Sequence, residues 1–136
     1  MTTPLYALIG FVFWTIAIVV AIGVTRVGQV ASGKMAANAF PAGQPHGGDR
    51  YWRMNRAHMN CLENLPLFAA VVLTGHVTGL TDGTFATLSQ VYIGARIAQT
   101  IAHIASNSVT VVNVRFTFFL AQMVCLMGMA WMCVNR

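Results

Sequence analysis

Apolar residues along the chain gather in four long stretches separated by short polar segments. The first stretch runs from Leu5 to Thr25 without a charged residue, and Pro4 before it suits the first turn of a helix. Because a helix rises about 1.5 Å per residue, about 20 residues cross the hydrocarbon core of a bilayer. This stretch is therefore long enough to span a membrane by itself, with Arg26 as an anchor at its end.

The second stretch begins as an amphipathic segment over residues 50–64 and continues as an apolar run to Leu80. A loop rich in glycine, alanine and proline precedes it over residues 31–49, and Asp49 is predicted to be the N-cap of the next helix. The sequence "TDGT" at residues 81–84 indicates a turn. The second and third stretches are therefore expected to form a tight antiparallel hairpin.

The third and fourth stretches, Phe85–Ser106 and Val109–Val134, are also long enough to cross a bilayer. The predicted transmembrane helices cover about residues 4–26, 50–80, 84–106 and 109–134. Short connections favour antiparallel neighbours. The predicted fold class is thus an all-α integral membrane protein, with one up-and-down four-helix bundle that occupies residues 1–136.

Composition and charge support a multi-pass membrane protein. Of the 136 residues, 57% are hydrophobic and 8% are charged, whereas soluble domains carry roughly 25% charged residues. The first connection and its flanks hold Arg26, Lys34, Arg50 and Arg53, and the third connection has Arg115 beside it. Basic residues at the ends of apolar stretches are typical of topology signals. We therefore expect the first and third connections to be cytoplasmic, and we expect no nucleic-acid partner in spite of the net charge of +5.

Two rows of polar side chains follow the helical repeat within the second and third stretches. The first polar row consists of Arg53, Arg56, Asn60 and Glu63, and the second polar row consists of Tyr92, Arg96, Gln99 and His103. Spacings of three and four residues place each row on one helix face. Charged side chains inside a membrane cost about 2.5–3.5 kcal/mol each. The rows must therefore face the bundle interior, a cavity or a partner subunit.

These rows have two explanations. They can form a structural network that fixes the register of the helices, in which Glu63 pairs with Arg96 or Arg56. Alternatively they form a ligand site, which is the usual role of ionisable groups within a membrane. Guanidinium groups bind carboxylates and phosphates bidentately, and Glu63 can hold an ammonium group. The ligand so described is a small zwitterion with excess negative charge, such as glutathione, or a lipid headgroup.

Other site chemistries lack their residue patterns. His58, His76 and His103 show no spacing typical of metal ligands, so no metal site is expected. The cysteines form no C-x-x-C pair and are expected to be buried thiols: Cys61, Cys125 and Cys133. Neither a serine hydrolase motif nor a glycine-rich phosphate loop is present.

Two segments resemble a known family. The sequence "RAHMNCLENLPLF" at residues 56–68 resembles the signature of the MAPEG family, the membrane-associated proteins in eicosanoid and glutathione metabolism. The residues that match the family pattern are Arg56, Ala57, Asn60, Glu63, Pro66 and Phe68. "GARIAQTIAHIA" at residues 94–105 is similar to the third-helix segment of the microsomal prostaglandin E synthase type. The chain thus resembles a bacterial-type member related to microsomal glutathione transferases, which implies the bacterial inner membrane.

The resemblance implies a homotrimer that binds glutathione as co-substrate between neighbouring subunits, near the cytoplasmic side. It implies that Arg115 stabilises the glutathione thiolate and is the catalytic residue. The implied glutathione-binding residues are Arg56, Asn60, Glu63, Arg96, Gln99 and His103. The expected function is a transferase or peroxidase that acts on small hydrophobic electrophiles. The alternative is a non-catalytic protein of the MAPEG fold that binds a lipid headgroup or a partner protein.

Overall fold

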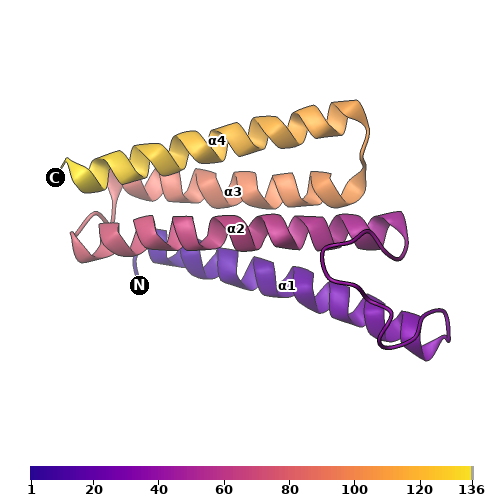
Figure 1. The fold of residues 1–136 in the computed structure, drawn as a ribbon. Helices are drawn as coiled ribbons and strands as arrows, with labels where there is room; N and C mark the ends of the chain where they lie inside the picture. The colour runs from indigo at the N-terminus through magenta and orange to yellow at the C-terminus, as the bar shows by residue number, and fades with distance from the viewer. Residues whose placement is uncertain (136) are drawn as a thin grey trace.

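The computed structural model describes residues 1–135, and this part of the chain folds into four α-helices with no strand. The helices are α1 (Thr3–Ala31), α2 (Asp49–Val77), α3 (Gly83–Ala105) and α4 (Val109–Val134). Successive helices run in opposite directions, and both termini lie at the same end (Figure 1). The predicted all-α, up-and-down arrangement of four helices is therefore confirmed.

Two helix ends differ from the predicted bounds. Helix α1 continues past Arg26 to Ala31, and α2 stops at Val77 rather than near residue 80. Both helices end where a glycine adopts a left-handed conformation, Gly33 with φ 70° and Gly79 with φ 79°. In each case the glycine and the residue after it donate backbone hydrogen bonds into the last turn, as in a Schellman motif. A left-handed glycine therefore ends each helix, whereas the prediction had ended the first helix at Arg26.

The beginning of α2 also differs from its prediction. Gly48 is the N-cap, and Asp49 is the first helical residue, with no side-chain capping hydrogen bond. The prediction of Asp49 as N-cap was therefore wrong by one residue. The carboxylate still lies in the first helical turn, where negative charge interacts favourably with the helix dipole.

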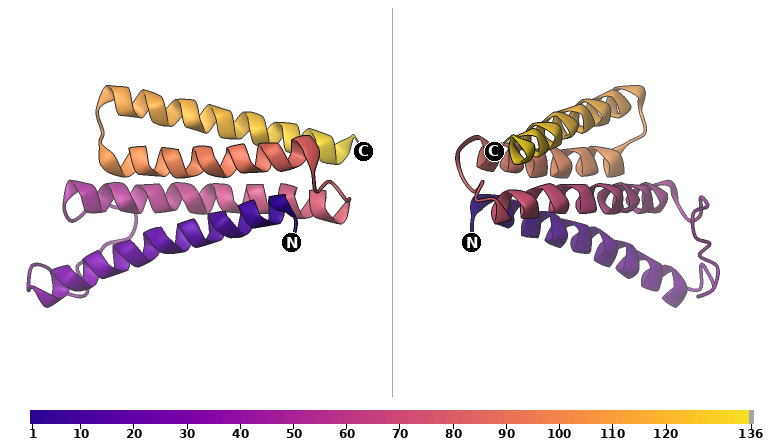
Figure 2. Two further views of the ribbon diagram at one scale, coloured as in Figure 1. Left: turned by 180° about the vertical axis from the view of Figure 1, so that it is seen from behind. Right: turned by 60° about the vertical axis from the view of Figure 1, so that its left-hand side comes forward.

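Aromatic rings join α1, α2 and α3 in the core. The rings of Phe68 and Tyr92 stack with their centroids 4.2 Å apart, and Phe11 packs against both at 6.1 and 6.2 Å. The thiols of Cys61 and Cys125 are buried and free, as predicted, whereas the free thiol of Cys133 is only partly buried. Helix α4 packs mainly on α3, and α1 and α4 lie on opposite sides of the α2–α3 pair (Figure 2). The four helices thus form a staggered row rather than a closed square.

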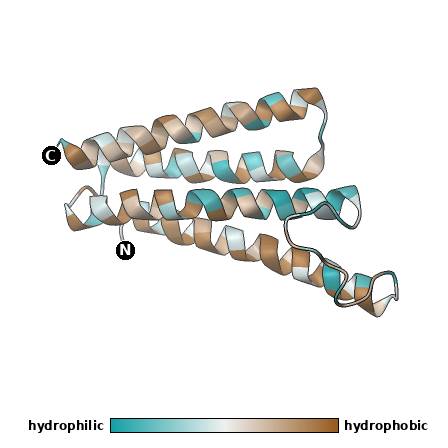
Figure 3. Cartoon of the chain, viewed as in Figure 1, coloured by the Kyte–Doolittle hydropathy of each residue, from teal (hydrophilic) through white to brown (hydrophobic). Residues whose placement is uncertain are grey.

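The outer surface is apolar over α1 and α4, which are long and apolar enough to cross a membrane by length and composition. Large hydrophobic side chains point outward there, among them Phe13, Val20, Val124 and Trp131. Polar residues are concentrated on α2 and α3, toward the end that carries the α1–α2 connection (Figure 3). That α2 and α3 also cross the bilayer stays a prediction from their length.

Candidate functional site

A cavity of about 620 Å³ opens at the end of the bundle formed by the α1–α2 and α3–α4 connections. Its size falls within the range of roughly 300–1,000 Å³ that encloses a small molecule. Its lining comes from all four helices and the first connection: Ile22, Arg26, Phe40, Pro41, Ala42, Gly43, His46, Tyr51, Trp52, Asn55, Arg56, Met59, Asn60, Glu63, His103 and Arg115. The two connections that were predicted to be cytoplasmic lie at this end.

Five of the seven predicted site residues line this cavity. Arg56, Asn60 and Glu63 lie on successive turns of α2, as their spacing predicts. His103 comes from the last turn of α3 and Arg115 from the second turn of α4. A three-residue turn between α3 and α4 returns the chain, so that these two side chains reach the same space.

Arg96 is buried beneath the cavity and does not line it. Its side chain is 0% exposed, and its Nη1 donates a hydrogen bond to Oδ1 of Asn60. The guanidinium carbon lies 5.6 Å from the centre of the Phe11 ring, within range of a cation–π interaction. Arg96 thus bonds to the amide of Asn60. Within the described residues 1–135, Glu63 forms neither of the ion pairs considered for it, with Arg96 or with Arg56.

Gln99 also lies behind the cavity wall. Its Nε2 donates to the backbone oxygen of Arg115 at 3.2 Å, and its Oε1 accepts from Nε2 of Gln122 at 3.0 Å. Gln122 is fully buried and also donates to the backbone oxygen of Phe118 at 2.9 Å. Gln99 thus joins α3 to the second turn of α4, which carries Arg115, and to Gln122 near the middle of α4. The site prediction did not include Gln122, although it stands seven residues after Arg115, on the same helix face.

The first residue of the first polar row has a structural contact. Arg53 donates from Nε to the backbone oxygen of Ile104 at 2.9 Å, in the last turn of α3. A cation at a helix C-terminus satisfies a free carbonyl and interacts favourably with the dipole. Arg53 therefore fastens the start of α2 to the end of α3 and does not line the cavity.

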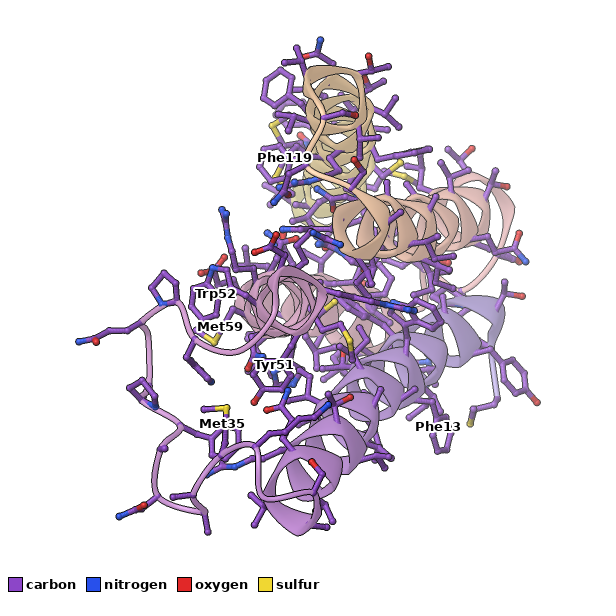
Figure 4. The ribbon with its side chains drawn as sticks, turned by 90° about the vertical axis from the view of Figure 1, so that its right-hand side faces the viewer. Phe13, Met35, Tyr51, Trp52, Met59 and Phe119 are labelled. Carbon is purple, nitrogen blue, oxygen red and sulfur yellow. The ribbon has the colours of Figure 1, made fainter. Side chains whose placement is uncertain are left out.

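One wall of the cavity, formed by the α1–α2 connection and the start of α2, is aromatic and was not predicted. The ring of His46 lies 5.4 Å from Tyr51 and 5.8 Å from Trp52, and Phe40 lies 5.9 Å from His46. Arg26 lies over Phe40, 4.2 Å from its ring centre. These contacts fold the α1–α2 connection back over the mouth of the cavity. Figure 4, viewed from this end, shows Tyr51 and Trp52 on the side of α2 that faces the connection.

Positive charge prevails around the cavity. Arg26, Arg56 and Arg115 line it, against the single carboxylate of Glu63. Three guanidinium groups with an amide and a carboxylate can bind an anion that also carries one cationic group. The aromatic wall adds an apolar surface next to these charges.

A comparison with protein families gives a match. The model of the MAPEG family matches residues 4–135, essentially the whole chain. No curated protein matches the chain. The family predicted from the segment 56–68 is therefore confirmed by a match that extends over all four helices.

Proposed function

The chain belongs to the MAPEG family of membrane proteins, and we propose that it is a glutathione-dependent transferase or peroxidase acting on hydrophobic electrophiles. The observation that carries the proposal is the convergence of Arg56, Asn60, Glu63, His103 and Arg115 on one cavity. These residues come from three helices, so the cavity depends on the fold and not only on one motif.

Glutathione has the charges that this cavity complements. It carries two carboxylates, one ammonium group and a thiol. The guanidinium groups of Arg56 and Arg26 can each bind a carboxylate bidentately, and the carboxylate of Glu63 can bind the ammonium group. Arg115 supplies a further cation, and a cation close to a thiol favours the thiolate. Arg115 is therefore the residue to which we assign thiolate stabilisation.

The bound thiolate then acts as the nucleophile. In transfer, its sulfur forms a bond to an electrophilic carbon, and the leaving group departs with the bonding electron pair. In peroxide reduction, the thiolate takes one peroxide oxygen to give the sulfenic acid and an alcohol, and a second glutathione gives the disulfide and water. Apolar acceptors reach the site from the bilayer, since the outer faces of α1 and α4 are apolar.

A neighbouring subunit completes the site in this proposal. Arg56 and Glu63 are exposed on the surface of the single chain, although charged groups at membrane depth are costly. In a homotrimer, a second copy would cover this face of α2 and enclose the ligand. We place the cavity on the cytoplasmic side of a bacterial inner membrane, following the distribution of basic residues.

The test is calorimetric titration of the purified protein with glutathione, together with a transfer assay. Arg115→Ala should lower the turnover number about a hundredfold, in line with the loss of one charge-stabilising donor. Arg50→Ala is the matched control, since Arg50 is exposed and does not line the cavity. A folded protein that shows no binding at millimolar glutathione would refute the proposal.

The excess of guanidinium groups also favours a second candidate, the binding of a phospholipid headgroup without catalysis. A phosphate matches an arginine fork as well as a carboxylate does. Native mass spectrometry distinguishes the two functions. A phospholipid that is released by Arg56→Ala and by Arg115→Ala, together with no thiol chemistry, would favour the lipid-binding function.

A further inference from the structure

The side-chain amide of Asn60 lies between a buried cation and the ligand cavity. Arg96 is fully buried on α3 and donates from Nη1 to Oδ1 of Asn60. Asn60 itself lines the cavity. One side of this amide is therefore bound by the protein, and the other faces the space for the ligand.

The contact with Arg96 decides which way the amide points. Arginine carries five N–H donors and no acceptor, so the atom of Asn60 that meets it must be the carbonyl oxygen. The opposite orientation would set N–H against N–H and leave a buried charge unbonded. Nε and Nη2 of Arg96 already lack a hydrogen-bond partner within residues 1–135. The oxygen of Asn60 is thus needed by Arg96, and the NH2 group is left for the cavity.

We propose that Arg96 is a positioning residue that fixes Asn60 as a hydrogen-bond donor toward the ligand. It never touches the ligand, and it acts only through the orientation of this amide. The group bound at Asn60 is then an acceptor, and with Arg56 on the adjacent turn of α2 it is a carboxylate. This inference rests on the proposed function, since it takes glutathione as the ligand.

Asn60→Asp separates this role from ordinary packing. Aspartate keeps the shape of the side chain and gives Arg96 an anionic acceptor, so the unfolding temperature should rise. The same change replaces the NH2 group with a charged oxygen that faces the ligand carboxylate. Glutathione should bind about tenfold more weakly or worse, since one charge-assisted hydrogen bond is replaced by repulsion. Higher stability with lower affinity is the expected signature.

Asn64→Asp is the matched control, one helical turn away. Asn64 is buried, does not line the cavity, and donates from Nδ2 to the backbone oxygen of Asn60 at 2.8 Å. Aspartate cannot make this donation and buries a charge without a cationic partner. The control should therefore lower the unfolding temperature and leave the glutathione affinity within about twofold, the reverse of Asn60→Asp.

The diethyl ester of glutathione identifies the ligand group. Its carbonyl oxygens still accept hydrogen bonds, but they carry no negative charge. The loss of affinity caused by Asn60→Asp should therefore be several-fold smaller for the ester than for glutathione. An equal loss for both ligands would show that no carboxylate lies at Asn60 and would overturn the inference.

The remaining outcomes are distinct. Wild-type protein that does not bind glutathione overturns the proposed function and this inference with it. Wild-type binding with an unchanged affinity in Asn60→Asp overturns the inference alone. An Asn60→Asp protein that is less stable than wild type, or that does not fold, also contradicts the inference, because a paired Arg96 should stabilise the bundle.

Discussion

The first and second polar rows both follow the helical repeat and yet have different surroundings. On α2, Arg56, Asn60 and Glu63 line the cavity, whereas on α3 Arg96 and Gln99 are buried behind its wall. Both helices pack against the other three, but Arg96 and Gln99 lie on a buried face of α3, whereas Arg56 lies on an exposed face of α2. A periodic row of polar residues therefore identifies a helix face. The packing of that face decides whether its residues line the cavity or are buried behind the cavity wall.

Removal of a cavity residue from the first row should produce the largest effect. Arg56→Ala deletes a charge-assisted contact worth about 1.5–3 kcal/mol, which corresponds to an affinity for glutathione that is at least about tenfold weaker. The unfolding temperature of the single subunit should stay close to that of wild type, because the side chain is exposed within its own chain. Calorimetry and thermal unfolding in detergent measure the two quantities. Arg50→Ala should change neither, and a loss of stability without loss of affinity would remove Arg56 from the site.

Substitution of a buried residue of the second polar row should instead lower the stability of the protein. Gln99→Leu removes the hydrogen bonds to Gln122 and to the backbone oxygen of Arg115, at a cost of about 1–3 kcal/mol in the free energy of unfolding. Adding Gln122→Leu should recover part of this loss, because both buried polar partners are then replaced by apolar groups. If the two losses simply add, the pair does not act as one contact between α3 and α4.

Arg53 belongs to the first polar row but has a structural contact. Arg53→Ala removes the hydrogen bond to the Ile104 carbonyl and should lower the free energy of unfolding by about 0.5–1.5 kcal/mol. Glutathione affinity should change much less than in Arg56→Ala. An equal loss of affinity in the two variants would mean that the ligand extends to Arg53.

The smallest effect is expected at Tyr92, the first residue of the second row. Its hydroxyl is buried and has no hydrogen-bond partner within residues 1–135, whereas its ring stacks on Phe68 at 4.2 Å. Tyr92→Phe keeps the ring and removes only the unpaired group. The free energy of unfolding should stay within about 0.5 kcal/mol of wild type. A loss well above this value would reveal a partner for the hydroxyl.

The sequence predicts the four helices well because long apolar stretches and helical spacing are local properties. It also predicts that Arg56, Asn60 and Glu63 share one face, since three- and four-residue spacings determine this directly. The ends of α1 and α2 depend on Gly33 and Gly79 in left-handed conformations. Those glycines are visible in the sequence, and the rule for helix C-caps would have placed both ends more closely.

The positions of Arg96 and Gln99 could not be predicted from the same pattern. Helical spacing shows that they share a face with His103, but it does not show which helices cover that face. The aromatic wall was missed for another reason. Phe40, His46 and Trp52 meet through a connection with no regular period, and their contacts arise only when this segment folds back onto α2.

Stabilisation of the glutathione thiolate by Arg115 is tested most directly by the ultraviolet absorbance of glutathione bound to the protein at neutral pH. Free glutathione is mostly a thiol at this pH, whereas a ligand beside Arg115 should be a thiolate with its own absorbance band. This band should appear as glutathione saturates the wild-type protein and should be absent in Arg115→Ala. Glutathione that binds without the band, or a band that persists in Arg115→Ala, would contradict the assignment of Arg115.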